Sequence, residues 1–311
     1  MKDFHLPLKA VQAGMPGPDK FAAKQWWLLV RSADPVLFKL PVMPESSSEN
    51  LLPDFAWYDS QFLTSYVRAK QYITRHCPQQ LAKFEAALAP LRTSPQFSVR
   101  EIMPLFDEPT HQLLKDTIAS VDKRQFELHE MRDFGRLVVH DHPVITTLQH
   151  DLTERVSAWV GEAVEPSYNF LSLYNQTGRC EPHMDAPSAK WTVDYCIEQS
   201  APWPIHFTDI LPWPEQWETD QDNWQARIRQ DGAHRFTAFT LKERQALVFS
   251  GSSQWHYRDA MPCLHARSFC HLVFFHFLPA GLRALAEPEN WADMFGIEGL
   301  RGLVIPERAK V

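Results

Sequence analysis

The second half of the chain constrains the fold most, because it is built from short apolar runs typical of β-strands. After Pro166 these runs are rich in aromatic and β-branched residues, and Gly, Pro, Asp or Ser bounds each of them. Short strands that follow one another without intervening helices predict an antiparallel sandwich or barrel. The expected strands are 169–174, 191–197, 235–240, 245–250 and 270–277.

The first half of the chain has the apolar spacing of helices instead. The expected helices are 59–91 (two helices broken near Cys77-Pro78), 110–121, 143–160 and a last one at 282–295. The segment 41–53 contains three consecutive serines between two glutamates and is expected to be an exposed loop. We therefore predict an α+β chain in which a helical N-terminal region, 1–165, packs on a β core with a C-terminal helix, 166–311, as one compact unit.

Charge and cysteine content exclude several classes of function. The formal net charge of −7 over 311 residues provides no basic field for nucleic acid or an anionic membrane. The five cysteines form no C-x-x-C pair, so neither a zinc knuckle nor a disulfide framework is indicated. The sequence has no run of about 18 apolar residues and no apolar leader at its start. A cytoplasmic protein with a small-molecule substrate is expected, and its oligomeric state stays open.

Three residues in the β half have the chemistry of metal ligands. In an extended chain His183 and Asp185 point to the same face, because side chains alternate with period two. His256 follows a strand and a Gly-Ser turn, 71 positions after Asp185, which suits a return strand. Two imidazoles and one carboxylate leave positions open on Fe(II) for a co-substrate and O₂, as non-haem oxygenases require.

Two arginines are candidates to bind a carboxylate near this metal. Arg267 lies eleven positions after His256, on or just before the next expected strand, where its planar fork could hold a dicarboxylate. Arg258 lies two positions after His256, so on an extended strand it shares the face of that ligand. The residues alone leave both Arg267 and Arg258 open as the carboxylate anchor.

The pattern H-x-D…H…R, preceded by Tyr174-x-x-x-Gly178, resembles the Fe(II)/2-oxoglutarate-dependent oxygenase superfamily over roughly residues 166–279. The resemblance implies a double-stranded β-helix (jelly-roll) core. It also implies that His183, Asp185 and His256 ligate iron, that Arg267 binds the distal carboxylate of 2-oxoglutarate, and that Tyr174 donates its hydroxyl to that co-substrate. Ser268 directly follows Arg267, whereas the family often has its serine one residue later.

The activity implied by the resemblance is oxidation of a small molecule, such as an amino acid or a biosynthetic intermediate. O₂ is consumed while 2-oxoglutarate is decarboxylated to succinate and CO₂. Because Asp185 is present, hydroxylation or desaturation is favoured over halogenation, for which relatives lack this carboxylate. Two alternatives are a peptidyl hydroxylase of the same superfamily and a non-catalytic β-helix protein that binds metal.

Other polar and aromatic residues have weaker claims to function. His140-Asp141-His142 has the H-x-H form of a cupin site, but Pro143 follows at once, so a loop or helix-capping role is preferred. His271 and His276 are expected in the core of the last strand. Residues that could line a pocket or simply pack in the core are Trp191, Trp203, Trp213 and Trp255, with Asn175 and Lys190 as ambiguous polar neighbours and Cys180 and Cys196 as buried thiols.

Overall fold

The computed structural model describes residues 27–30, 36–39, 61–214, 228–229, 234–262 and 268–303. The strands are β1 (Trp27–Val30), β2 (Val36–Lys39), β3 (Arg100–Ile102), β4 (Arg136–His140), β5 (Val164–Tyr174), β6 (Cys180–His183), β7 (Trp191–Gln199), β8 (Ile205–Thr208), β9 (Phe236–Phe239), β10 (Ala246–Phe249), β11 (His256–Arg258) and β12 (Cys270–Pro279). The helices are α2 (Gln61–His76), α3 (Leu81–Leu88), α4 (Glu108–Ser120), α5 (Pro143–Val160), α7 (Arg283–Ala286) and α8 (Trp291–Phe295). The 3-10 turns are η2 (Pro78–Gln80), η3 (Ala89–Leu91), η4 (Lys123–Gln125), η5 (His129–Met131), η6 (Pro187–Ala189), η7 (Pro288–Asn290) and η8 (Glu298–Leu303).

Two antiparallel sheets form the centre of the described structure. The large sheet has the strand order β3-β10-β7-β12-β5-β4, and the small sheet has the order β6-β11-β8-β9. From β5 onward the chain crosses repeatedly between the sheets, with β5, β7, β10 and β12 in the large one and β6, β8, β9 and β11 in the small one. A cluster of apolar side chains from both sheets packs between them. The strands and this cluster are the scaffold of the site.

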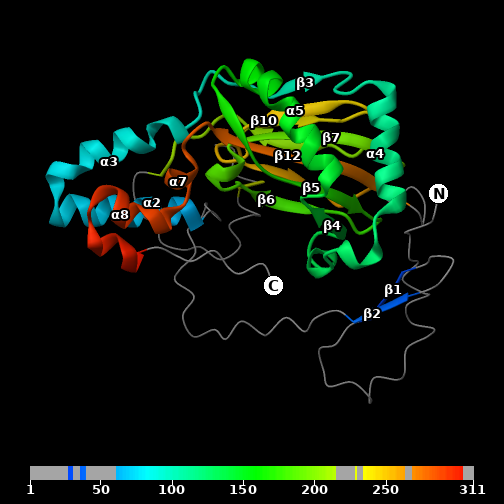
Figure 1. Cartoon of the computed structure of the whole chain (residues 1–311), viewed down its shortest axis with the longest axis horizontal. Coiled ribbons are helices and arrows are strands. Elements are labelled where there is room, and N and C mark those ends of the chain that lie inside the picture. The colour runs from blue at the N-terminus through cyan, green and yellow to red at the C-terminus, as the bar shows by residue number, and fades with distance from the viewer. Residues whose placement is uncertain are drawn as a thin grey trace, which may run out of the picture.

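Helices α4 and α5 cover the outer face of the large sheet (Figure 1). Helix α5 begins at Pro143, whose missing N–H costs nothing in the first turn, and ends at Gly161, which has a left-handed φ of 77°. Its buried residues Ile145, Leu152 and Val156 recur at helical spacing and contact the sheet. The helix thus shields the side of the sheet that points away from the small sheet.

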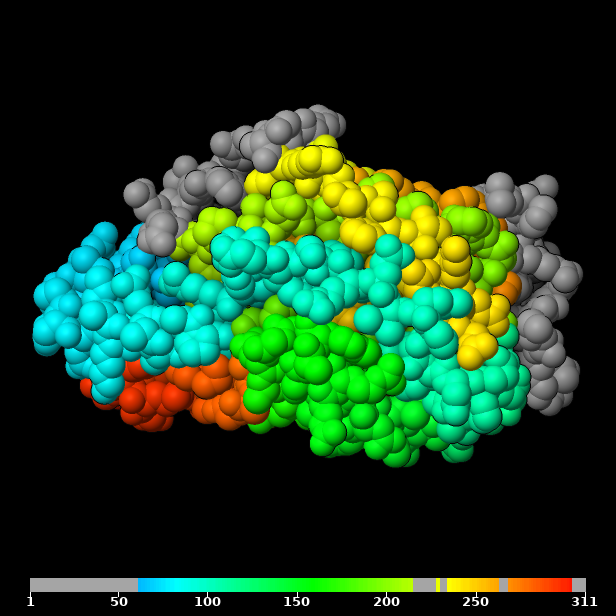
Figure 2. Space-filling model, turned by 90° about the horizontal axis from the view of Figure 1, so that it is seen from above, coloured from blue at the N-terminus to red at the C-terminus, as the bar shows by residue number. Residues whose placement is uncertain are grey.

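A helical lobe joins the first helices of the described chain to its last elements. Helices α2 and α3 pack against α8 and η8, and these elements share one apolar cluster. Trp291 of α8 contacts Phe62 of α2 and Phe84 of α3, with ring centroids 5.3 and 5.4 Å apart. Figure 2 shows the same grouping, because the light-blue early residues and the red late residues adjoin at one end of the molecule.

Most expected helices and strands are confirmed with small shifts at their ends. Helix α5 has the predicted bounds 143–160, and the break between α2 and α3 lies at Cys77-Pro78. The single late helix predicted over 282–295 is wrong, because Pro288 follows α7 and opens a 3-10 turn before α8 begins. The expected boundary at 165/166 falls inside β5. The loop expected at 41–53 lies outside the described residues.

The first half of the chain is less purely helical than predicted. Strands β3 and β4 precede β5 in the sequence and extend the large sheet at its two edges. Strand β4 is only five residues long and pairs with β5 from Arg136↔Tyr174 to His140↔Phe170.

None of the described helices combines the length and the apolar content that a membrane-spanning helix needs.

Candidate metal centre

The three predicted metal ligands come together at one end of the small sheet. His183 ends β6 and His256 begins β11, and these two residues are register partners. Asp185 follows β6, with its carboxylate oxygens 3.7 Å from His183 Nε2 and 3.8 Å from His256 Nε2. The three donor atoms all lie within 4.8 Å of one another. Such separations suit donors that share one ion through bonds of about 2 Å each.

Backbone carbonyls orient both imidazoles so that Nε2 faces Asp185. The Nδ1–H of His183 donates to the Glu181 carbonyl oxygen at 2.8 Å, and that of His256 donates to the Gln254 carbonyl oxygen at 3.0 Å. A carbonyl oxygen only accepts, so Nδ1 carries a proton in both rings, and a ring in its neutral form has its lone pair on Nε2. Burial lowers the pKa of His183, but Cys180 and Asp185 outweigh it and raise that pKa to about 10, so a metal would displace a proton from its Nε2. Burial, and then the neighbouring His183, lower the pKa of His256 well below its ordinary value, which favours this neutral form.

Gly251 allows the backbone to approach Asp185 closely. The Asp185 N–H donates to the Gly251 carbonyl oxygen at 2.9 Å. A Cβ at position 251 would overlap with Asp185 Oδ2 and lie 2.7 Å from the Ala189 carbonyl oxygen. The turn after β10 therefore needs a residue without a side chain here, and it fixes where the carboxylate lies.

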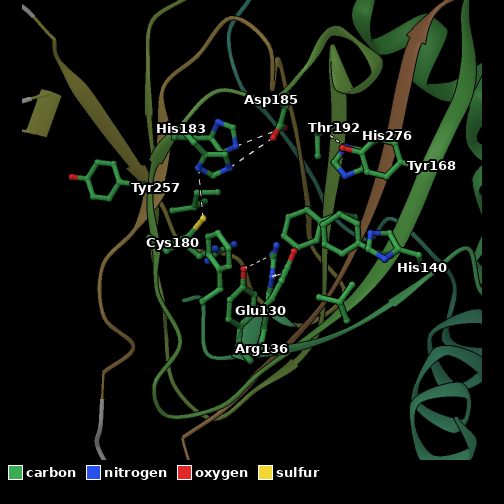
Figure 3. Close-up of a pocket in the computed structure, with 18 of the residues that line it drawn as sticks. Glu130, Arg136, His140, Tyr168, Cys180, His183, Asp185, Thr192, Tyr257 and His276 are labelled. Carbon is green, nitrogen blue, oxygen red and sulfur yellow. Dashed lines mark hydrogen bonds and ion pairs between the residues drawn. The ribbon is translucent and has the colours of Figure 1, made fainter. Parts of the chain in front are cut away.

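A cavity of about 270 Å³ lies beside the triad, between the two sheets (Figure 3). Side chains of the large sheet alternate between its outer face and this cavity. In β4, Leu137 and Val139 pack outward, whereas Arg136, Val138 and His140 line the cavity. The same alternation directs side chains from β5, β7 and β12 inward. These further cavity-lining residues are Phe170, Tyr174, Thr192, Phe274 and His276.

Arg258 lines the cavity and is already bonded to a buried carboxylate. Its Nη2 donates to Asp194 Oδ2 at 2.7 Å and its Nη1 donates to the Trp203 carbonyl oxygen at 2.6 Å. Arg258 is 2% exposed and Asp194 is fully buried. Burial raises the pKa of Asp194, and the adjacent guanidinium opposes this rise. Arg267, the other expected carboxylate anchor, lies outside the described residues.

Tyr174 and Arg136 form a second polar group on the cavity wall. The Nη1 of Arg136 donates to the Tyr174 hydroxyl at 2.7 Å, and its Nε donates to Glu130. The guanidinium lies about 5 Å from the ring centroids of Phe134 and Phe170, a cation–π arrangement. Burial raises the pKa of Tyr174 to about 12, so its hydroxyl keeps a proton that can be donated to a ligand.

The histidines with weaker claims have separate roles. His142 is the N-cap residue of α5, as the capping interpretation predicted. That interpretation is wrong for His140, which ends β4, lines the cavity and lies 2.7 Å from Glu127. His276 is buried as predicted, but it too faces the cavity, with Nδ1 3.0 Å from Thr192 Oγ1.

The aromatic and polar residues of uncertain role lie in the core or in turns. Lys190 donates to Glu162 and Asn175 accepts from the backbone of its own turn, so neither contributes to the cavity wall. Cys180 does line the cavity, with Sγ 3.6 Å from His183 Nδ1. The four candidate tryptophans, none of which is among the described lining residues, are buried: Trp191, Trp203, Trp213 and Trp255.

Sequence reasoning missed the wall that β4 and the preceding turn contribute. Arg136, His129 and Glu130 line the cavity, yet they come from a stretch without a metal motif. The alternation Arg-Leu-Val-Val-His over 136–140 was the available signal for a strand, with polar residues at both ends on one face. The segment 136–140 is only five residues long, so this signal was weak beside the longer helical patterns around it.

No protein-family model matches the sequence, and no curated protein matches it significantly. Several solved structures are similar. The non-heme alpha ketoglutarate dependent carbocyclase SnoK from nogalamycin biosynthesis has a TM-score of 0.48 and 9% identity, over 64% of this chain and 89% of SnoK. EctD from S. alaskensis with 2-oxoglutarate and 5-hydroxyectoine has a TM-score of 0.43 and 12% identity, over 64% of this chain and 76% of EctD.

HygX from Streptomyces hygroscopicus, solved with nickel, 2-oxoglutarate and hygromycin B bound, has a TM-score of 0.43 and 9% identity, over 65% of this chain and 87% of HygX. All three neighbours are described as dependent on 2-oxoglutarate or as holding it. What they bind is a property of those proteins. The chemistry of this chain depends on its own residues.

Proposed function

We propose that the chain is a 2-oxoglutarate-dependent non-haem iron oxygenase that acts on a small molecule. The observation that supports it most is the convergence of His183, Asp185 and His256 at a cavity that also contains two guanidinium groups. In this interpretation the crossing of the chain between the two sheets is the strand order of a double-stranded β-helix.

The donor set fits Fe(II). Two neutral imidazoles and one carboxylate occupy one side of an ion and leave the other side open, which is the ligand arrangement of non-haem Fe(II) oxygenases. His183, Asp185 and His256 would hold the ion, which when bound supplies the redox chemistry for activating O₂. In the overall reaction one oxygen atom enters a C–H bond of the substrate. The other enters succinate as 2-oxoglutarate loses CO₂.

The protein's own contribution is to bind and orient the co-substrate. Tyr174 has a hydroxyl proton to donate, and the cavity side chains exclude water. The distal carboxylate of 2-oxoglutarate needs a cation whose charge is not already matched. Arg258 is matched by Asp194, so we keep Arg267 as the proposed anchor and Arg258 as the alternative.

The size of the cavity supports a small substrate. Ligand pockets usually enclose about 300–1,000 Å³, and the cavity of about 270 Å³ is slightly smaller than that range. The arginines and the tyrosine in its wall favour an enzyme over a protein that merely stores or senses the metal, because such a protein would not need ligand-binding groups beside its ion.

The test is Fe(II) binding and 2-oxoglutarate turnover by ligand variants. His183→Ala and His256→Ala should each weaken Fe(II) binding by more than about 100-fold, because even outer-shell partners contribute about 10–100-fold. Both should also abolish succinate formation in the presence of ascorbate. His150→Ala, an exposed histidine on α5, is the matched control and should behave as wild type. Normal turnover in either ligand variant would contradict the proposal.

A further inference from the structure

We propose that the Arg136–Glu130 pair selects a zwitterionic substrate, namely a free α-amino acid whose carboxylate binds Arg136 and whose ammonium group binds Glu130. This inference rests on the proposed function and assigns the class of molecule that the oxygenase oxidises. Both residues line the cavity, and Figure 3 shows them on the side of it opposite His183 and Asp185. A ligand held by the pair therefore lies between that wall and the metal.

The pair is held rigidly but still has atoms to offer. Arg136 uses Nε for Glu130 and Nη1 for Tyr174, and among the described residues Nη2 makes no hydrogen bond. Glu130 Oε2 accepts from Arg136, while Oε1 has His129 Nε2 at 3.7 Å, longer than a hydrogen bond. One donor and one acceptor of the same ion pair thus remain available, which matches the opposite charges of an α-amino acid.

Charge balance favours a zwitterion over a simple anion or cation. The Arg136 and Glu130 charges cancel, and their side chains are only 13% and 18% exposed. A ligand with one charge would leave an unmatched charge in this poorly solvated wall, which is costly. A zwitterion adds one charge of each sign, so that its carboxylate is matched by Arg136 and its ammonium group by Glu130.

The other ion pair at the cavity is unsuited to this role. Arg258 and Asp194 are almost fully buried, and Asp194 is not among the residues that line the cavity. An ammonium group in the cavity has no access to that carboxylate. The Arg136–Glu130 pair presents both partners to the cavity wall.

The experiment measures succinate formation in the presence of three pools of candidate substrates, whose members are matched in shape and differ in charge. The first contains the twenty protein L-amino acids, the second their carboxamides, and the third the corresponding 2-hydroxy acids. Wild-type protein with Fe(II), 2-oxoglutarate and ascorbate should be stimulated by the first pool and by neither of the others. Equal stimulation by an amide or hydroxy-acid pool, or no stimulation by free amino acids, would overturn the inference.

Two variants separate substrate selection from a structural role. Arg136→Met should raise the KM for the stimulating amino acid by about 10–100-fold, the value of a charged hydrogen bond, and should shift preference toward the amide pool. Glu130→Gln should shift preference toward the 2-hydroxy acids. Arg283→Met, an exposed arginine paired with Glu165, is the control and should change neither preference.

The KM for 2-oxoglutarate distinguishes the competing assignment. If Arg136→Met raised that KM and left the KM for the amino acid unchanged, Arg136 would be the co-substrate anchor and the inference would be wrong. The proposed function has its own readout in the substrate-free turnover of 2-oxoglutarate and in Fe(II) binding. If these occur in wild type while free amino acids fail to stimulate, only the zwitterion inference fails.

Discussion

Residue by residue, the candidate site owes its geometry to backbone atoms as much as to side chains. The Glu181 and Gln254 carbonyl oxygens set the two imidazoles, and the Gly251 carbonyl oxygen accepts from the Asp185 N–H. Glu181 lies in β6, and Gly251 and Gln254 lie in the turn between β10 and β11. The ligand positions therefore depend on strand register, which apolar packing between the sheets maintains.

Gly251→Ala tests this dependence on the backbone. The added methyl group would overlap with Asp185 Oδ2, so the carboxylate must move from its position between the histidines or the turn must shift. Misplacement by about 1 Å can cost about 100-fold in rate, and we expect a loss of that order in Fe(II)-dependent 2-oxoglutarate turnover. Gly302→Ala, where a Cβ meets open space, is the control. Unchanged turnover in Gly251→Ala would show that Asp185 is not held by this turn.

Among the elements, α5 should contribute strongly to stability because it shields the outer face of the large sheet. Leu152 is buried between this helix and the sheet. Leu152→Ala should lower the free energy of unfolding by about 2–5 kcal/mol, the usual range for a buried leucine. Leu113→Ala, at a 45% exposed position on α4, should cost less than about 0.5 kcal/mol. Urea denaturation measures both, and similar losses would contradict the packing described here.

The elements also show what sequence patterns can and cannot predict. Helix α5 was predicted with its correct ends because Pro143 marks its first turn and the apolar spacing continues through its length. Strands β3, β8 and β11 have only three or four residues and were not predicted, although β9 and β10, which are four residues long, were. Length alone therefore does not explain the difference. Their positions are set by pairing with distant strands, and local sequence does not encode such partners.

At the scale of the whole molecule, the helical lobe ties the early helices to the end of the chain. Trp291→Ala removes ring contacts with both Phe62 and Phe84 and should cost about 3–5 kcal/mol in unfolding free energy. Met294→Ala on the same helix, at a 43% exposed position, is the matched control. Equal unfolding midpoints in urea for the two variants would show that the lobe does not depend on this tryptophan.

The site as a whole was only partly accessible from sequence. The triad was predictable because the H-x-D spacing of an extended segment directs His183 and Asp185 to one face, even though Asp185 lies just past the end of β6, and because His256 follows a recognisable turn. The wall formed by Arg136 and Glu130 was not, because β4 joins the cavity only through pairing with β5. Whether Arg136 pairs with Glu130 or with another carboxylate depends on side-chain positions that no spacing rule provides.

The two imidazoles, which the Glu181 and Gln254 carbonyl oxygens hold in place, bear on which metal ion would occupy the proposed site. At the proposed site, raw affinity alone would not select iron among the divalent metals. That affinity rises from Mn²⁺ through Fe²⁺ to Cu²⁺ for sites of nitrogen and oxygen donors. Iron is thus among the weaker competitors, and the metal found in protein isolated from cells should reflect which ions were available during growth.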